Sequence, residues 1–302
     1  MAGDMHQFGE LFKEIQGAKL KTIVVANAAD EEVLSAVSMA HQKGMANAIL
    51  VGDKGAIKAE ADKHAIDISP FEILHEADMA KIPYTAVQLV SSGKADVLMK
   101  GLLQTADFFR AVLDHSVGLR VNGQIISSIA VVEVPGWNRF LLLTDIGLIP
   151  APDLETKIAL IKNSVPLAKR LGAEIPKVGI LCAAENINPK IQSMVDGDTL
   201  AKMNERNEIT DCIIAGPISF DLAVSEESAR HKGYTHPVAG KADILIMPNL
   251  ETGNGVIKAI TCFAKYKGGG IIAGTAKPLI FTSRSDTDET KLNSIALAIY
   301  LS

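Results

Sequence analysis

Three stretches of this 302-residue chain place basic, hydroxyl or amide side chains where a predicted strand gives way to a predicted helix. Such a junction presents unpaired backbone N–H groups and the positive end of a helix dipole, and both favour an anionic ligand such as phosphate. In α/β folds these junctions lie at the carboxyl edge of the sheet, where ligands bind. The three stretches cover residues 242–258, 282–286 and 99–110.

In the stretch 242–258, a buried strand leads into a helix through a loop that carries Gly253 and Gly255. The two glycines resemble the start of a dinucleotide fingerprint, but Lys258 occupies the third glycine position and no Gly-Lys-Ser/Thr triplet follows. A Rossmann site and a P-loop are therefore disfavoured, while a purely structural turn stays open as the alternative. The candidate phosphate-binding residues here are Asn249, Glu251, Gly253 and Asn254.

The stretch 282–286 lies between an apolar run that ends at Phe281 and a terminal helix predicted from about Asp288. Ser283 and Asp286 are of the types that cap helices, so capping is one explanation of them. Arg284 is harder to explain by capping, because a guanidinium beside hydroxyls and a helix start is a bidentate receptor for phosphate or carboxylate.

In the stretch 99–110, a strand ends beside Gly101 and a helix begins near Thr105. Arg110 lies about one turn further on, where it could reach the same anion or pair with Asp107 or Asp114. The residues expected to converge on the anion are Lys100, Gln104 and Thr105.

Composition excludes several other classes of function. The net charge of -5 and the pI near 5.8 give no basic surface for nucleic acid. Apolar stretches fall short of the ~20 residues that a membrane span needs, and the first ten residues contain no apolar signal core, so we expect a cytoplasmic protein. Motifs for zinc hydrolysis or for a nucleophile-elbow serine are absent, so no metal is expected.

Short apolar runs alternate with segments of helical period along the chain, which predicts an α/β fold with a mainly parallel sheet. Residues 125–134 and 140–144 read as an antiparallel hairpin around a tight turn. A long helix from Asp153 to Leu171 then leads into a second α/β series, which indicates a domain crossing near residue 150. The glycines of Lys267–Gly270 are expected to cap the helix that precedes them.

Residues 99–113, 240–254 and 279–286 together resemble the phosphate acetyl/butyryl transferases, and the resemblance extends over nearly the whole chain. The sequences Lys100-Gly-Leu-Leu-Gln-Thr105 and Thr282-Ser-Arg-Ser-Asp286 look more like the butyryl branch than the acetyl branch. The resemblance implies two three-layer α/β domains, similar to the isocitrate and isopropylmalate dehydrogenases, with the site in the cleft between them. The expected domains are 1–148 plus 275–302, and 149–274.

The resemblance also implies roles for individual residues. Arg284 would hold phosphate or acyl phosphate, Ser283 would hydrogen-bond the reacting thiol or carbonyl oxygen, and Arg110 would contact ligand phosphates. In the acetyl enzymes an aspartate seven positions past the motif serine looks like the general base, but Thr290 stands there in this chain. Glu289 is therefore the first candidate for the base and Asp286 the second.

The implied reaction exchanges a butyryl or branched acyl group between coenzyme A and phosphate in a ternary complex. Coenzyme A is then a substrate, no cofactor is needed, and we expect a homo-oligomer of at least two chains. Three alternatives stay open: a phosphate acetyltransferase, an NAD-dependent decarboxylating dehydrogenase, and a non-catalytic anion-binding protein. The dehydrogenase would carry metal-binding carboxylates and a nicotinamide loop, and neither is found in the sequence.

Overall fold

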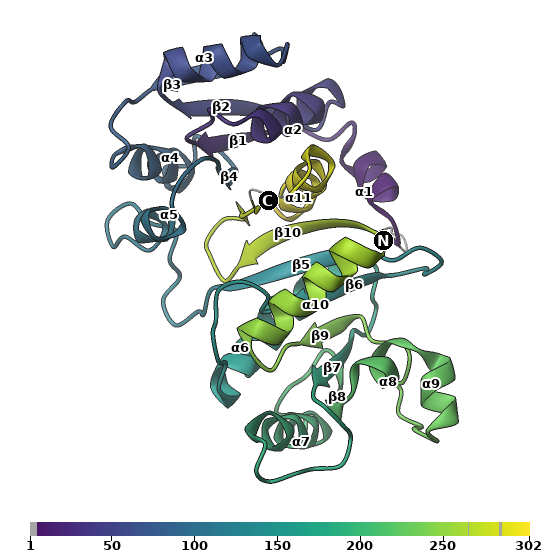
Figure 1. The fold of residues 1–302 in the computed structure, drawn as a ribbon. Coiled ribbons are helices and arrows are strands. Elements are labelled where there is room, and N and C mark those ends of the chain that lie inside the picture. The colour runs from purple at the N-terminus through teal and green to yellow at the C-terminus, as the bar shows by residue number, and fades with distance from the viewer. Residues whose placement is uncertain (1–4, 265, 284–285) are drawn as a thin grey trace. The chain divides into compact units, whose positions relative to one another are not determined.

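The computed structural model describes residues 5–264, 266–283 and 286–302, which divide into two compact units (Figure 1). We call residues 5–7 and 127–267 the central unit, and residues 8–126 and 268–302 the split unit, because two distant parts of the chain build it. The chain passes from one unit to the other after Gln7, Ile126 and Lys267. The sequence-based boundaries after residues 148 and 274 stay a prediction.

The split unit is a sheet of order β3-β2-β1-β4-β11-β10 with helices against it. Strands β1, β2, β3, β4 and β11 are parallel, and β10 is antiparallel to β11. Its elements are α1 (Phe8–Ile15), β1 (Lys21–Ala26), α2 (Glu31–Gln42), β2 (Ala46–Gly52), α3 (Lys54–Lys63), β3 (Glu72–His75), α4 (Ile82–Ser91), β4 (Val97–Lys100), α5 (Thr105–Val112), β10 (Lys267–Ala273), β11 (Leu279–Ile280) and α11 (Asp288–Leu301).

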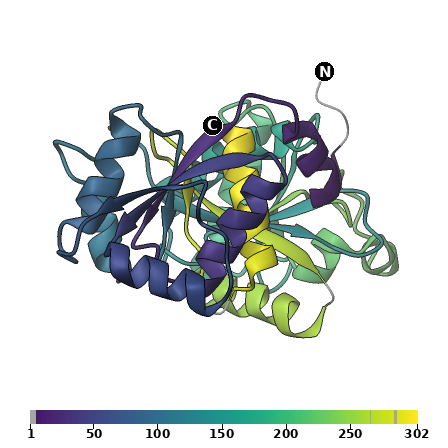
Figure 2. The ribbon, with the colours of Figure 1, turned by 90° about the horizontal axis from the view of Figure 1, so that it is seen from above.

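The terminal helix α11 packs between α1 and α2 of the split unit, as the view from above shows (Figure 2). Local chemistry sets the ends of these elements: the Asp30 carboxylate caps α2 by accepting from the Val33 amide at 3.0 Å. Gly44, at φ +66°, follows the same helix in the left-handed conformation that glycine favours.

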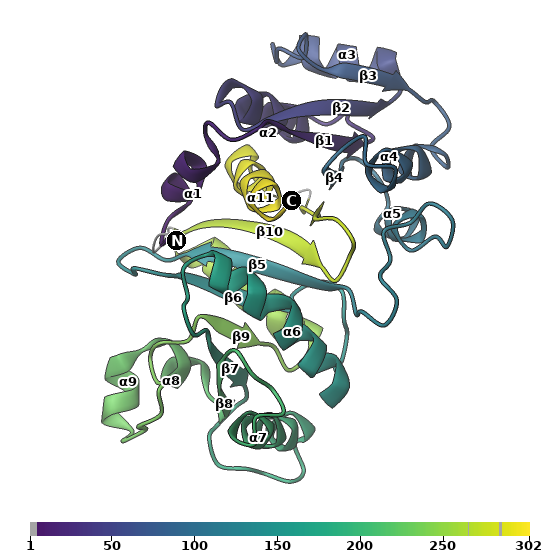
Figure 3. The ribbon, with the colours of Figure 1, turned by 180° about the vertical axis from the view of Figure 1, so that it is seen from behind.

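The central unit has the strand order β5-β6-β9-β7-β8, with an antiparallel β5–β6 pair and parallel pairing elsewhere. Helices α6 and α10 lie on opposite faces of this sheet (Figures 1 and 3). Its elements are β5 (Ser127–Glu133), β6 (Phe140–Thr144), α6 (Leu154–Arg170), β7 (Lys177–Leu181), α7 (Gln192–Glu205), β8 (Ile213–Ile218), α8 (Phe220–Val224), α9 (Glu226–His231), β9 (Ile244–Ile246) and α10 (Leu250–Phe263).

The predicted α/β class and the predicted hairpin are confirmed. The expectation that Lys267–Gly270 caps a helix is wrong, because these residues begin strand β10. Among the described residues, no helix combines enough length and apolar character to cross a membrane.

Candidate functional site

In the split unit, Lys100 and the 281–283 segment follow neighbouring parallel strands. Ile280 of β11 pairs with Met99 of β4, so both strands end at the same edge of the sheet. The Lys100 side chain is buried, with 7 % of the residue exposed. Its Nζ donates to the Gly101 carbonyl at 3.3 Å and lies 5.6 Å from the centre of the Phe281 ring. A buried ammonium at a sheet edge is suited to binding an anion.

Gly101 allows the backbone after Lys100 to pass very close to the end of β1. A Cβ at this position would lie 2.1 Å from the Asn27 carbonyl oxygen, so any side chain would displace the segment. The amides of Gly101 and Leu102 donate to the Ala26 and Asn27 carbonyls, both at 2.9 Å. Sequence reasoning did not select Gly101 or Asn27 as site residues, although a glycine directly after the candidate lysine is the signal that could have found the first.

Two further contacts shape the segment that holds Ser283. The Ser283 amide donates to the Asp286 carboxylate at 2.7 Å, and the Asp286 carbonyl accepts from Lys291 Nζ at 2.5 Å. Lys291 is buried, with 2 % of the residue exposed. Burial raises the pKa of the nearby Asp30 carboxyl, and the positive charge of Lys291 opposes that rise. Arg284, the predicted phosphate ligand, lies outside the described residues.

Both candidates for the general base belong to this part of the split unit. Glu289 is exposed in the first turn of α11, where a carboxylate is favoured by the helix dipole. Thr287 caps the helix by accepting from the Thr290 amide at 3.2 Å. The Asp286 carboxylate accepts a hydrogen bond from the Ser283 amide. The predicted location of Glu289 in the first helical turn is confirmed.

At the start of α5, Gln104 and Thr105 are exposed, and Thr105 is the first helical residue, as predicted. Gln104 occupies the cap position and its side chain makes no capping hydrogen bond. Arg110 Nη1 donates to the Asp107 carboxylate at 2.6 Å. Arg110 is expected from the sequence either to reach the anion or to pair with a nearby aspartate, and the structure shows the ion pair with Asp107. A surface ion pair of this kind is weak, so a phosphate can replace it.

In the central unit, the predicted loop around Gly253 is wrong, because α10 begins at Leu250 directly after Asn249. The Asn249 side chain caps the helix by accepting from the Thr252 amide at 2.8 Å, and the Gly253 amide donates to the Asn249 carbonyl at 3.1 Å. The Leu250 amide donates to Pro150 at 3.0 Å. The amides of Leu250, Thr252 and Gly253 are thus used within the fold. Glu251 and Asn254 are exposed.

Gly253 has a packing function instead. A Cβ there would lie 2.4 Å from the Asp145 carbonyl oxygen, so only glycine lets α10 approach the end of β6 this closely. Asp145 itself is buried, and its carboxylate accepts from the amide and hydroxyl of Ser128 at 2.7 and 2.8 Å. The amides of residues 147–149 also donate to it, at 2.6–3.3 Å. Sequence reasoning missed Asp145, since these partners depend on the folded hairpin.

The structure therefore brings together part of the predicted site. Lys100 and Ser283 follow neighbouring strands of the split unit, with Asp286 close to Ser283. Asn249, Glu251, Gly253 and Asn254 belong to the central unit. Within residues 5–264, 266–283 and 286–302, no three His, Cys, Asp or Glu side chains gather as a protein metal site would require.

An α/β chain with this arrangement of motifs matches the family model described as "Phosphate acetyl/butaryl transferase" over residues 8–83 and 74–299. The chain belongs to this family. It is 48 % identical over 291 residues to a phosphate butyryltransferase of Clostridium acetobutylicum, a match that covers 96 % of each chain. A phosphate acetyltransferase of Thermotoga maritima is 38 % identical over 96 % of this chain and 98 % of its own.

A solved structure with a similar fold is that of a branched-chain phosphotransacylase from Enterococcus faecalis V583. Its TM-score to this chain is 0.82 at 33 % sequence identity, and the match covers 93 % of this chain and 98 % of the other. The predicted resemblance to the family is confirmed.

Proposed function

We propose that this chain is a phosphate butyryltransferase, which exchanges a butyryl or branched short-chain acyl group between coenzyme A and inorganic phosphate. The observation that carries the proposal is the 48 % identity to a phosphate butyryltransferase over 96 % of both chains. The name of the similar solved structure, a branched-chain phosphotransacylase, supports an acyl group larger than acetyl.

The reaction needs a cationic site for phosphate or acyl phosphate beside the carbonyl carbon under attack. The buried Lys100 ammonium and the Arg284 guanidinium supply that positive charge, and Ser283 donates to the reacting oxygen or thiol. Arg110 contributes after release from Asp107. Positive charge at this point stabilises the oxyanion of the tetrahedral intermediate more than it stabilises the neutral carbonyl.

In the direction of acyl-CoA synthesis, the coenzyme A thiol loses its proton to Glu289, and the thiolate attacks the carbonyl carbon of the acyl phosphate. The C–S bond forms, the tetrahedral intermediate collapses, and the C–O bond to phosphate breaks. Phosphate leaves with the bonding electron pair. A ternary complex is sufficient for this exchange, because holding both reactants in place supplies much of the rate. Coenzyme A acts as a substrate, and the reaction calls for no additional cofactor.

The test is an assay of acyl-CoA formation from acyl phosphate and coenzyme A with acetyl, butyryl and isobutyryl donors. Four-carbon donors are expected to have the higher kcat/KM, by up to about fourfold for each methylene, since burying one contributes about 0.8 kcal/mol. Equal or better use of acetyl phosphate assigns the chain to the acetyl branch. Absence of transfer with all three donors contradicts the proposed function.

The Arg284 role is tested in the same assay. Arg284→Ala is expected to abolish turnover, and Arg284→Lys to impair it severely, because an ammonium cannot reproduce the bidentate geometry of a guanidinium. Circular dichroism checks that each variant is folded. A folded Arg284→Ala variant with the parent rate contradicts the assigned role.

We also propose that the enzyme works in the cytoplasm as a homo-oligomer of at least two chains. Exposed apolar surface on α10 supports self-association: Phe263 is 91 % exposed, and Ile257 and Ile260 are half-buried. Light scattering is expected to give at least twice the chain mass of 32.1 kDa. A mass of one chain at assay concentrations contradicts this proposal.

A further inference from the structure

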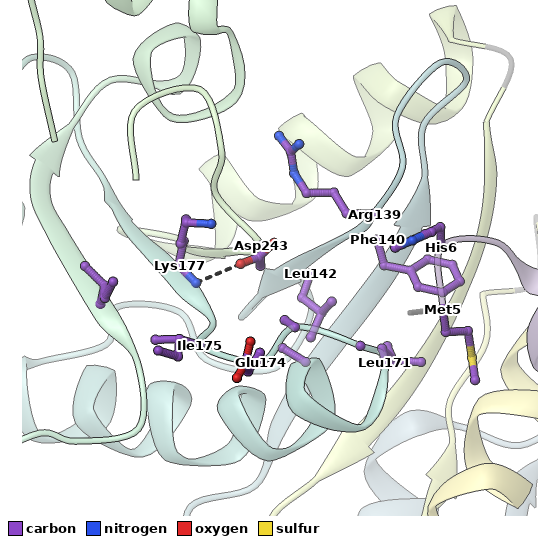
Figure 4. Close-up of a pocket in the computed structure, with 14 residues that line it drawn as sticks. Met5, His6, Arg139, Phe140, Leu142, Leu171, Glu174, Ile175, Lys177 and Asp243 are labelled. Atoms are coloured by element: carbon purple, nitrogen blue, oxygen red, sulfur yellow. Dashed lines mark hydrogen bonds between the residues drawn. The ribbon is translucent and has the colours of Figure 1, made fainter. Parts of the chain in front are cut away.

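A cavity of about 400 Å³ lies at the amino ends of the central unit's strands (Figure 4). It is lined by the first residues of three strands, Phe140, Lys177 and Ile213, and by Asp243, which directly precedes β9. Asn249 and Asp145, in contrast, follow the carboxyl ends of β9 and β6. The cavity therefore lies at the other end of these strands from Asn249 and Asp145, and none of the residues proposed for acyl transfer lines it. Its volume falls within the ~300–1,000 Å³ of small-molecule sites.

Asp243 brings an incompletely paired carboxylate to this cavity. Only 8 % of the residue is exposed, and its Oδ2 accepts from the Lys177 amide at 2.8 Å (Figure 4). Among the described residues, Oδ1 accepts no hydrogen bond and no cation lies in ion-pair range. Burial accordingly raises the pKa of this carboxyl. The positive charges of Lys177 and Arg139 oppose that rise in the pKa. The second carboxylate oxygen therefore remains able to accept a hydrogen bond from a ligand in the cavity.

Arg139 brings the opposite charge to the same cavity. Its Nη2 donates to the Gly240 carbonyl at 2.9 Å, and its guanidinium lies 4.3 Å from the Trp137 ring centre, which fixes its orientation. Desolvation lowers the pKa of this half-buried guanidinium. Within the part of the chain that the structure describes, no carboxylate lies within ion-pair distance of it. Asp243 and Arg139 thus line one cavity without pairing with each other.

The remaining wall combines apolar side chains, among them Leu142, Leu171 and Ile213, with two further charged residues, Glu174 and Lys177. The cavity therefore presents acidic groups, Asp243 and Glu174, together with basic groups, Arg139 and Lys177. A simple anion would face the acidic groups, and a simple amine would face the basic ones. A zwitterion with an aliphatic body satisfies both charges and the apolar wall together. We propose that this cavity binds an aliphatic α-amino acid, with its ammonium on Asp243, its carboxylate on Arg139 and its side chain against Leu142 and Leu171.

Titration calorimetry on the full chain tests the proposal with three probes of one carbon skeleton. L-leucine carries both charges, leucinol lacks the carboxylate, and 4-methylpentanoate lacks the ammonium. Leucine is expected to bind saturably, and each single-charge analogue at least about tenfold more weakly, which corresponds to one lost charged contact. Either an absence of saturable leucine binding or equal binding of the three probes overturns the proposal.

Two variants, each with a matched control, test whether leucine binds in this cavity. Asp243→Asn keeps an acceptor for the Lys177 amide but removes the charge, and is expected to weaken leucine binding by about 30-fold or more, as is Arg139→Gln. The controls Asp211→Asn and Arg206→Gln change exposed, ion-paired residues of the same unit and are expected to bind leucine as the parent does.

The acyl-transfer rate without leucine is expected to be unchanged in Asp243→Asn, because none of the residues proposed for acyl transfer lines the cavity. If either Asp243→Asn or Arg139→Gln fails to fold, leucine binding to the other variant tests the assignment. Leucine binding of parent strength in a folded Asp243→Asn or Arg139→Gln variant overturns the assignment.

Discussion

At the carboxyl edge of the central unit's sheet, Asn249 and Asp145 use their side-chain oxygens to accept from backbone amides, and Gly253 serves close packing. At the corresponding edge of the split unit, the buried Lys100 ammonium donates to the Gly101 carbonyl and faces the Phe281 ring, and Gln104 and Thr105 are exposed. The two edges carry polar residues of similar type. The motif around Asn249 thus contributes to the fold, and we expect the motif around Lys100 to be the one that acts on the ligand.

The largest expected effect comes from removing the buried cation of the split unit. Lys100→Met should lower kcat/KM for acyl phosphate by about 100-fold or more, since a preorganised charge in a desolvated site stabilises the developing oxyanion strongly. Steady-state kinetics measure it. Lys94→Met, an exposed position two residues before Asp96 in the same unit, is the matched control and should keep the parent rate. A folded Lys100→Met enzyme with the parent kcat/KM would show that Lys100 does not act on the ligand, and the two sheet edges would then not differ in function.

The general base gives the next largest effect and sharpens the comparison within the split unit. Glu289→Gln should lower kcat by about 100-fold near neutral pH, the usual contribution of a positioned base. The rate should recover partly as pH rises toward the thiol pKa of about 8.5, because the thiol then ionises unaided. Asp286→Asn should do less. Normal pH–rate profiles in both variants show that the positive field alone ionises the thiol.

Two glycines of α10 test the packing function of the central unit. Gly253→Ala should destabilise the fold by about 1–3 kcal/mol, because its Cβ would collide with the Asp145 carbonyl. Gly255, two residues on, has nothing within 4 Å of the added Cβ. Gly255→Ala should therefore stabilise the fold by about 0.5–1 kcal/mol, as expected for alanine in a helix. Urea unfolding measures both, and equal shifts of the same sign refute the close approach.

The smallest effect concerns the helix cap. Asn249→Ala should cost about 1 kcal/mol of stability, and Asn249→Ser should cost little, because serine also accepts the capping amide. Both folded variants should keep the parent transfer rate if Asn249 is structural. A rate that falls in Asn249→Ser, with stability preserved, would show that the central edge contacts ligand after all.

The sequence predicts strand β1, the β5–β6 hairpin and the start of α5 because alternation, turn residues and apolar runs are local signals. The sequence predicts Gly253 in a loop, whereas the residue lies inside α10. Glycine is needed there because the helix approaches Asp145, which lies more than a hundred residues earlier in the chain.

The same reason explains the wrong interpretation of the 267–270 glycines. At Gly269 a Cβ would lie 2.8 Å from the Ser294 amide of α11, so the position needs glycine for a contact that local sequence does not reveal. Long-range approach of backbone segments is therefore what sequence reasoning could not supply, at the site as well as in the fold.

The split unit has a consequence for biosynthesis. Strand β11 pairs with β4, where Leu279 is the partner of Leu98, and α11 packs on α2. Residues 8–126 therefore cannot complete their sheet and helix packing until β11 and α11 have been synthesised. The central unit is complete in sequence well before that. Non-local pairing is slow and leaves strand edges exposed until it is complete. The nascent chain should therefore depend most on chaperones before β11 and α11 have left the ribosome.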